Sequence, residues 1–382
     1  MGVFIILVIL ALLGVVFFLS YLSYRTSNFP VFRNMTGGRK KRAWLICFLI
    51  YLAVCAALTL TLNLVNTVIC LVHLGGFWLL SELVFLIIRK KRYGPDSKAA
   101  SAIPLFTWLP GVCAIIFTVC YMLVAWYLCT SVREKDYTIE SDHLKGDLRI
   151  VQFADSHVGA TFDAEGLHNY VLEINALNPD IVLITGDFVD DDTSREDMLG
   201  SCEALGDLNT KYGVFFSYGN HDKGYFSEEA RGWSNSDLYE SLVKNGVIVL
   251  QDDVQLVDGR FYVIGRQDKS ESYRGVIRKT PAELMEGLDP DLYKIVLDHQ
   301  PVEYREEALA GADLVLSGHT HGGQFFPFNQ MGVLTGEYDR SYGHEQRDHT
   351  DFIVTSGISD WNLIFKTGCR SEYVVIDIHG TA

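Results

Sequence analysis

Short apolar strands that end in Asp, Asn or His constrain the fold of this chain more than any other feature. The segment Ile181–Thr185 is entirely apolar or β-branched, which is the pattern of a strand buried on both faces. Gly186 then permits a sharp turn, and Asp187 follows the strand's carboxyl end. Ligands of open α/β sheets bind at that end, so Asp187 is a candidate carboxylate shared by two metal ions. On this segment alone, an acidic surface turn is the simpler explanation.

Four other predicted strands end in the same kinds of side chain, and together they reverse that preference. These strands, at residues 148–154, 213–218, 294–297 and 314–317, lead into DSH at 155–157, GNHD at 219–222, DHQP at 298–301 and GHTHGGQ at 318–324. Residues i and i+2 of an extended chain point to the same side. Asp155 and His157 can therefore aim at one point. The same holds for His319 and His321.

The ligand types indicate which metals fit. Carboxylate oxygen, amide oxygen and imidazole nitrogen together suit Mn, Fe or Zn, and the absence of thiolate argues against a structural zinc site. Seven candidate ligands are too many for one ion and about right for two divalent ions that share an Asp. The seven are Asp155, His157, Asp187, Asn220, His299, His319 and His321.

The rest of the C-terminal part predicts an α/β architecture. Further strands are expected at residues 247–250, 261–264, 352–355 and 372–377, and helices at 167–177, 236–244 and 302–310. Alternating strands and helices favour an α/β fold, and about 240 residues can bury one substantial core.

The order of the motifs DSH, GDFVD, GNHD, DHQP and GHTHGGQ resembles the calcineurin-like metallophosphoesterase family over residues 146–382. The GGQ extension and the run Ser356–Tyr373 look closest to a membrane-associated bacterial branch. That branch includes cell-envelope phosphoesterases and lipid A-pathway UDP-diacylglucosamine pyrophosphatases. The resemblance implies a two-sheet sandwich flanked by helices and a pair of Mn, Fe or Zn ions.

The resemblance also implies roles for individual residues. One metal is bound by Asp155, His157 and His321, the second by Asn220, His299 and His319, and Asp187 bridges them. His221 faces the phosphate and the leaving oxygen, and Asp190 orients it. Arg370 is a candidate for substrate binding. Ser156 departs from the small or apolar residue usual between Asp and His, but it points away from the metals.

The N-terminal part has a different composition from the rest. Residues 1–130 carry 11 Lys and Arg against two acids, while residues 131–382 carry 21 basic and 45 acidic residues. Four apolar runs, at about 3–22, 43–62, 65–88 and 105–128, reach the length of a membrane-spanning helix. We therefore predict a membrane domain at 1–130 and a phosphoesterase domain at 131–382.

The basic residues of the membrane domain predict its orientation. They gather in the loop from Arg25 to Arg42 and in the loop from Arg89 to Lys98, whereas the turn at 63–66 has none. The positive-inside rule places both basic loops in the cytoplasm. The N-terminus and residues 131–382 are then outside the cytoplasm, in a multi-pass membrane protein. His73 and Glu82 are expected to bond within the membrane domain, Glu82 toward its basic end, rather than to form a proton relay.

Charge and cysteine content exclude some functions. The acidic domain argues against nucleic acid as a partner, since that binding needs basic surface. Six of the eight cysteines lie in apolar runs, and only Cys202 and Cys369 belong to the acidic part, so no disulfide framework is indicated. A single bridge between those two stays open. The sequence does not indicate an oligomeric state.

We therefore predict a membrane-anchored phosphoesterase with two metal ions. The expected reaction is hydrolysis of a phosphodiester or pyrophosphate bond in a lipid-linked or envelope substrate, by attack of a hydroxide that bridges the ions. One alternative is a phosphomonoesterase acting on a polyprenyl or soluble phosphate. Two others are a membrane sensor that has kept the fold without catalysis and a transport module regulated by the acidic domain. His344 and His349 are expected to be surface or rim residues, while Arg266 and Asp268, which follow a strand, are further candidates for substrate contact.

Overall fold

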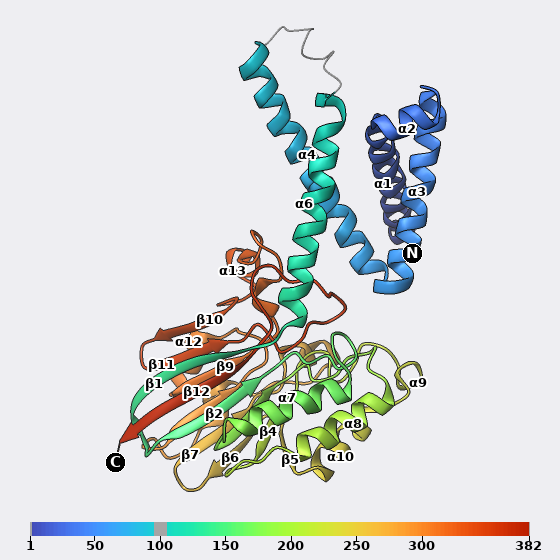
Figure 1. The fold of residues 1–382 in the computed structure, drawn as a ribbon. Coiled ribbons are helices and arrows are strands. Elements are labelled where there is room, and N and C mark those ends of the chain that lie inside the picture. The colour runs from blue at the N-terminus through green and yellow to red at the C-terminus, as the bar shows by residue number, and fades with distance from the viewer. Residues whose placement is uncertain (1, 95–104, 382) are drawn as a thin grey trace. The chain divides into compact units, whose positions relative to one another are not determined.

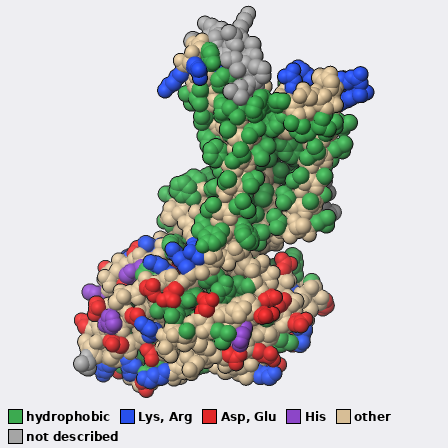
Figure 2. Space-filling view, in the orientation of Figure 1, with side chains coloured by type: hydrophobic (Ala, Val, Ile, Leu, Met, Phe, Trp, Pro, Cys, Tyr) green, Lys and Arg blue, Asp and Glu red, His purple; other side chains and the backbone are tan. Residues whose placement is uncertain are grey.

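The chain divides into two compact units, Met1–Val124 and Ala125–Ala382. The structure is a computed structural model that describes residues 2–94 and 105–381, with the side chains of 14–94 and 106–381 (Figure 1). Hydrophobic side chains cover the visible face of the first unit, and charged side chains are spread over that of the second (Figure 2). This contrast follows the difference in composition between the two parts.

The first unit is helical. Its helices are α1 (Gly2–Thr26), α2 (Pro30–Met35), α3 (Lys40–Leu62), α4 (Leu64–Tyr93) and most of α6 (Leu105–Thr130). Among the residues that were described in full, three helical segments are long and apolar enough to cross a membrane, namely Lys40–Leu62, Leu64–Tyr93 and Phe106–Thr130. The structure thus shows three such helices where the sequence predicted four. The first predicted span, 3–22, falls within α1, and its side chains before Gly14 lie outside the described residues.

The second unit contains two six-stranded sheets (Figure 1). The first has the order β1 (Arg133–Lys145), β12 (Glu372–Thr381), β2 (Leu148–Phe153), β3 (Ile181–Thr185), β4 (Val214–Ser217), β5 (Val247–Leu250). The second has the order β10 (Gly343–Arg347), β11 (Thr350–Val354), β9 (Leu314–Ser317), β8 (Tyr293–Leu297), β7 (Phe261–Gly265), β6 (Asp253–Val257).

The inner strands of each sheet are parallel, so their carboxyl ends meet. Strands β2 to β5 pair in parallel, with Phe153 opposite Ile184 and Thr185 opposite Ser217. Strands β7, β8, β9 and β11 also pair in parallel, with Leu297 opposite Leu316. Antiparallel pairs occur toward the edges, at β2 with β12, β10 with β11, and β6 with β7. The loops after β2, β3, β4, β8 and β9 therefore gather on one side.

Apolar layers hold the two sheets and their helices together. Between the sheets, one buried cluster combines Ile150 and Leu183 of the first sheet with Ile295 and Leu316 of the second. A second cluster joins the outer face of the first sheet to α7 (Ala164–Ala176), α8 (Arg195–Gly206) and α10 (Asn235–Lys244). A third joins the second sheet to α11 (Pro281–Met285) and α12 (Tyr304–Ala310). This arrangement confirms the predicted two-sheet sandwich flanked by helices.

Three strands and four α-helices of this unit, α8, α9 (Glu228–Arg231), α11 and α13 (Met331–Thr335), were not predicted. Strands β1, β6 and β10 lie at sheet edges, and most of their side chains are exposed or half-buried. They carry many polar residues, so the apolar pattern that reveals buried strands is absent. Helix α8 has a weak apolar stripe. The remaining short elements are η1 (Lys269–Arg274) and η2 (His321–Gly323).

Candidate metal centre

The candidate metal ligands adopt unusual backbone conformations just after the strand ends. Five of the seven have a positive φ, which L-residues rarely adopt: Asp155 (55°), His157 (37°), Asp187 (52°), His319 (70°) and His321 (47°). Each such conformation costs about 1–3 kcal/mol and persists only where the surroundings impose it. A concentration of such residues at one place is typical of functional sites.

Two glycines allow the loops after β3 and β4 to approach each other closely. A Cβ atom on Gly219 would lie 2.2 Å from Asp187 Oδ1. A Cβ atom on Gly186 would lie 2.4 Å from the backbone nitrogen of Gly219 and 2.9 Å from His299 Nδ1. Any side chain at either position would therefore separate the groups that the sheet brings together.

The first candidate ligand group combines Asp155, His157 and His321. Their ligand atoms all lie within 4.8 Å of one another, and all three residues are buried. His319 donates its backbone N–H to both carboxylate oxygens of Asp155, at 3.0 Å each. His321 Nε2 lies 3.9 Å from Asp155 Oδ1. The loops after β2 and β9 thus build this group together.

The second candidate group combines Asp187, His299 and His319, again with ligand atoms within 4.8 Å of one another. His299 Nε2 lies 3.0 Å from Asp187 Oδ2 and 3.3 Å from His319 Nδ1. Asn220 Oδ1 lies 3.1 Å from His299 Nε2, so the amide oxygen adjoins the same group. The loops after β3, β4, β8 and β9 contribute these four side chains.

Asp187 lies between the two groups. Its Oδ2 is 3.7 Å from His157 Nε2 in the first group and 3.0 Å from His299 Nε2 in the second. Its Oδ1 accepts the backbone N–H of His221 at 2.8 Å. The carboxylate therefore has one oxygen held by the protein and the other directed at both groups.

The histidines present nitrogens suited to metal binding. His299 Nδ1 lies 2.8 Å from the carbonyl oxygen of Thr185, an arrangement that places the ring proton on Nδ1 and leaves Nε2 as the ligand atom. His157 Nε2 is buried and has no hydrogen-bond partner among the described residues. A buried imidazole nitrogen without a partner, aimed at a carboxylate, fits a site for a divalent cation.

Asp190 contacts a different histidine from the one expected. The family resemblance implied that Asp190 orients His221, but Asp190 Oδ2 lies 3.2 Å from His157 Nδ1. Asp190 also accepts the backbone N–H of Asp192 at 2.9 Å. The expected pairing with His221 depended on the GDxxD spacing, and the folded loop instead brings the carboxylate to His157.

His221 lies beside the ligand groups with its ring among aromatic neighbours. Its ring centroid is 5.1 Å from that of His157, 5.2 Å from that of Tyr225 and 6.4 Å from that of Trp361. Burial lowers the pKa of His221, although the nearby Asp187 carboxylate acts in the opposite direction. Tyr225 also accepts a hydrogen bond from Asn220 Nδ2 at 2.9 Å.

Burial and neighbouring charges shift the other ionisable groups in different directions. Burial raises the pKa of Asp155 to about 6 and lowers that of His319 to about 3. Burial also opposes ionisation of Asp187, but the adjacent His299, His221 and His157 bring its pKa well below the usual value. These surroundings therefore keep the Asp187 carboxylate charged.

Asp222 is a structural carboxylate that the sequence analysis missed. It is fully buried and accepts the backbone N–H groups of Asp187 (2.9 Å), Phe188 (2.7 Å), Val189 (3.1 Å) and Gly219 (2.7 Å). Burial raises its pKa to about 6. Its position directly after His221 in GNHD could have indicated this role, because a buried loop needs acceptors for its N–H groups.

Asp360 is a second carboxylate that the sequence analysis missed. It is fully buried, and its Oδ1 lies 3.3 Å from His321 Nδ1. Its Oδ2 accepts a hydrogen bond from Gln324 Nε2 at 2.7 Å and lies 3.8 Å from Lys366 Nζ. Lys366 is also fully buried and donates to the carbonyl oxygens of Ser356 (2.8 Å) and Ser359 (3.1 Å). The GGQ extension thus holds the carboxylate that faces His321.

Arg370 and Arg266, both considered for substrate contact, have other partners. Arg370 Nε donates to the carbonyl oxygen of Ser131 at 2.6 Å, and its guanidinium lies 5.4 Å from the ring centroid of Tyr127. Arg266 is buried and forms ion pairs with three carboxylates, Asp298 (2.7 Å), Glu303 (2.7 Å) and Glu307 (3.0 Å). Neither guanidinium has a hydrogen bond to a candidate metal ligand within the described part of the chain.

Five other residues considered from the sequence do not belong to the two ligand groups. Asp268 accepts hydrogen bonds from Gln300 Nε2 at 3.0 and 3.1 Å. His344 Nε2 lies 2.6 Å from Asp351 Oδ1, and His349 is exposed in the turn between β10 and β11. Cys202 and Cys369 are free thiols.

Comparison with known proteins is consistent with this geometry. A family model described as calcineurin-like phosphoesterase matches residues 148–323. A metallophosphoesterase of Aquifex aeolicus is 34% identical over 254 residues, which cover 65% of this chain and 92% of that protein. A metallophosphoesterase of Campylobacter jejuni is 31% identical over 252 residues, covering 64% of this chain and 63% of that protein.

A third relative is a Danio rerio protein named transmembrane protein with metallophosphoesterase domain. It is 30% identical over 242 residues, which cover 59% of this chain and 52% of that protein. The chain thus spans between half and two thirds of the Danio rerio and Campylobacter jejuni relatives. Relatives of this kind occur in eukaryotes as well as in bacteria, a wider range than the bacterial branch expected from the sequence. This chain belongs to the calcineurin-like metallophosphoesterase family.

Proposed function

We propose that this protein is a membrane-anchored phosphoesterase that uses two divalent metal ions, Mn, Fe or Zn. The observation that carries the proposal is the position of Asp187 Oδ2, 3.7 Å from His157 Nε2 and 3.0 Å from His299 Nε2. Asp155, His157 and His321 would hold one ion, and Asn220, His299 and His319 the other. Two ions, when bound, lower the pKa of a coordinated water and stabilise the charge of a phosphoryl group during displacement.

The protein's own groups prepare the site for that chemistry. Asp187 and the buried imidazoles would bind the ions. Asp190 orients His157 through a hydrogen bond to Nδ1, and the Asp360 carboxylate lies 3.3 Å from His321 Nδ1. His221, beside the ligand groups, donates a hydrogen bond to the phosphoryl oxygens or a proton to the leaving group.

The substrate class in this proposal is a lipid-linked or envelope phosphodiester or pyrophosphate. Its support is an exposed apolar segment that directly follows the GGQ motif and contains Phe326, Phe328, Met331 and Leu334. The same segment leads to Tyr338, whose hydroxyl lies 3.2 Å from His319 Nε2. Apolar side chains exposed beside a polar phosphoester site fit a substrate with a lipid portion.

The proposed location of the catalytic unit is outside the cytoplasm. The basic residues between Arg89 and Lys98 place that loop in the cytoplasm by the positive-inside rule, and α6 then crosses the membrane outward. This reasoning does not depend on whether α1 spans the bilayer. Protease added to intact cells should cleave the catalytic unit, and full protection would contradict the proposed orientation.

The activity is tested with full-length protein in detergent micelles. After chelation and addition of Mn, we expect hydrolysis of bis-p-nitrophenyl phosphate to exceed that of p-nitrophenyl phosphate. The Asp187→Asn variant should hydrolyse neither compound and should bind less metal, because one negative charge shared by two cations is lost. Faster monoester hydrolysis would favour a phosphomonoesterase. No hydrolysis of either compound by the metal-loaded protein would contradict the enzyme assignment.

A further inference from the structure

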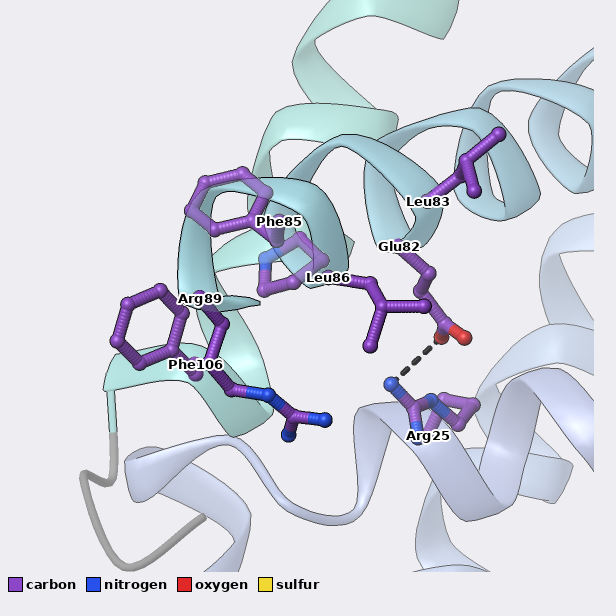
Figure 3. Close-up of a pocket in the computed structure, with 8 residues that line it drawn as sticks. Arg25, Glu82, Leu83, Phe85, Leu86, Arg89 and Phe106 are labelled. Atoms are coloured by element: carbon purple, nitrogen blue, oxygen red, sulfur yellow. Dashed lines mark ion pairs between the residues drawn. The ribbon is translucent and has the colours of Figure 1, made fainter. Parts of the chain in front are cut away.

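The helical unit contains a cavity that the proposed phosphoesterase function does not use. The cavity has a volume of about 280 Å³ and lies between α1, α4 and α6 (Figure 3). It is close to the end of α4, whose last turn carries Lys90, Lys91 and Arg92. About nine water molecules of roughly 30 Å³ each would fill such a volume, which suits a small headgroup.

Two guanidinium groups face this cavity, but only one carboxylate does. Arg25 Nη2 lies 2.6 Å from Glu82 Oε1, and that carboxylate also accepts hydrogen bonds from Trp78 Nε1 (2.9 Å) and Tyr21 Oη (3.3 Å). Glu82 is therefore fully engaged, and Arg25 neutralises its charge. Arg89 brings a second guanidinium that points into the same space (Figure 3). Arg89 has no ion pair with any residue that the structure describes, so the cavity has a net positive charge.

Arg25, which lines this cavity, also has an unused hydrogen-bond donor. Arg25 Nε is buried and has no hydrogen-bond partner among the described residues. A buried N–H group without an acceptor is costly, and an anionic oxygen satisfies it best. The charge of Arg89 and the free donor of Arg25 therefore point to the same kind of ligand, an anion.

The walls of the cavity are apolar, which further restricts the class of ligand that fits. Phe85 and Phe106 pack edge to face with ring centroids 6.2 Å apart, and Leu83, Leu86 and Pro110 complete the lining. Leu83 and Leu86 are exposed on the surface of a helix that is long and apolar enough to span a membrane. A ligand with an anionic group at the arginines and hydrocarbon along these leucines satisfies both parts of the site.

We propose that this cavity binds the phosphate headgroup of an anionic glycerophospholipid. The phosphate lies at Arg89 and Arg25, and the acyl chains extend along the exposed leucines of α4. The adjoining basic loop is assigned to the cytoplasmic side, where anionic lipids attract clusters of Lys and Arg. The proposal concerns only the helical unit and holds whatever the catalytic unit hydrolyses.

The test measures lipid binding to the full-length protein in a nonionic detergent by native mass spectrometry. Dioleoyl-phosphatidylglycerol is titrated against wild-type protein and against Arg89→Gln. The matched control is Lys91→Gln, which removes one exposed positive charge from the same turn but lies outside the cavity. Leu86→Trp, which fills the cavity without changing charge, is a second variant in case Arg89→Gln does not fold.

We expect Arg89→Gln and Leu86→Trp to weaken phosphatidylglycerol binding about tenfold or more, and Lys91→Gln less than about twofold, because only the first two change the headgroup site. Equal loss in Arg89→Gln and Lys91→Gln would overturn the proposal, as would equal wild-type affinity for dioleoyl-phosphatidylcholine. Displacement of the lipid by millimolar inorganic phosphate would assign the site to free phosphate instead.

Discussion

At the scale of single residues, the two ring nitrogens of His157 face two different carboxylates. Nδ1 lies 3.2 Å from Asp190 Oδ2, and Nε2 lies 3.7 Å from Asp187 Oδ2. A carboxylate behind a metal-binding histidine sets its tautomer and increases its basicity. Asp190 is therefore better placed to support metal binding than to orient His221.

Asp190→Asn separates these two roles. If Asp190 acts through His157, the variant should bind metal about 10- to 100-fold more weakly. Metal content after equilibrium dialysis, measured by mass spectrometry of the elements, checks this. Asp192→Asn is the matched control, because Asp192 is exposed in the same loop. A variant with unchanged metal content and reduced turnover would instead show that Asp190 acts on His221.

His221→Ala should leave metal binding intact and reduce turnover. The backbone N–H that His221 donates to Asp187 Oδ1 is retained by alanine, so the loop keeps its main contact. The ring is lost, and with it a contribution of about 10²- to 10⁴-fold typical of acid–base catalysis. Steady-state kinetics and metal analysis of the same sample test the expectation. Wild-type turnover would refute the catalytic role of the ring.

At the scale of elements, the apolar strands were predictable and the polar edge strands were not. The predicted ranges 181–185, 247–250 and 314–317 coincide with β3, β5 and β9. Strands β3 and β9 are wholly buried, and β5, although it lies at a sheet edge, has only apolar residues, so their apolar runs indicate all three directly. An edge strand such as β1 pairs on one side only and tolerates polar residues, so its pairing depends on β12, far along the chain.

The close approach of the loops after β3 and β4 is an element-scale feature that Gly186→Ala tests. The new Cβ would lie 2.4 Å from the backbone nitrogen of Gly219, and the residue already has a φ of 79°. We expect overpacking to lower the free energy of unfolding by about 1–3 kcal/mol, in addition to the loss caused by the strain of a positive φ. Metal binding should weaken as well, since Asp187 is the next residue.

Gly232→Ala is the control for that variant. Gly232 has a similar φ of 81°, but a Cβ there would have no atom within 4 Å. The Gly232→Ala variant should therefore lose only about 1 kcal/mol of its free energy of unfolding, which is the part due to backbone strain. Thermal unfolding followed by intrinsic fluorescence compares the two. Equal losses of stability would show that the close approach of the loops is not important.

At the scale of the whole molecule, the catalytic unit includes the last turn of α6. The carbonyl oxygen of Ala125 accepts the backbone N–H of Lys366 at 3.0 Å, and that of Leu128 accepts the N–H of Ser371 at 3.0 Å. Cys129 also accepts a hydrogen bond from Ser371 Oγ at 2.6 Å. The compact unit begins at Ala125, within a helix, while a domain boundary at residue 131 stays a prediction.

Two fragments test this boundary. A fragment of residues 131–382 lacks the three acceptors from α6 that a fragment of residues 125–382 retains. At about 0.5–1.5 kcal/mol for each hydrogen bond, the shorter fragment should be less stable by roughly 2–4 kcal/mol. Chemical denaturation in mild detergent measures the difference. Equal stability would show that the last turn of α6 is not an integral part of the catalytic unit.

The sequence by itself determined the fold class, the family and the choice of candidate ligands. Buried strands and the Asp, Asn and His residues after them are local patterns, because an apolar run and a strand-end ligand each lie within a few consecutive residues. The apolar runs of the N-terminal part are equally local. Such features need no knowledge of which distant segments become neighbours.

Only the tertiary structure decided the contacts between distant segments. It placed Asp190 on His157, Asp360 behind His321, and Arg370 against the end of α6. It also revealed the cavity between three helices. Each of these contacts depends on loops brought together by packing of sheets or helices. A side chain with two neighbours within reach has no local signal that selects one, so the packed geometry makes the choice.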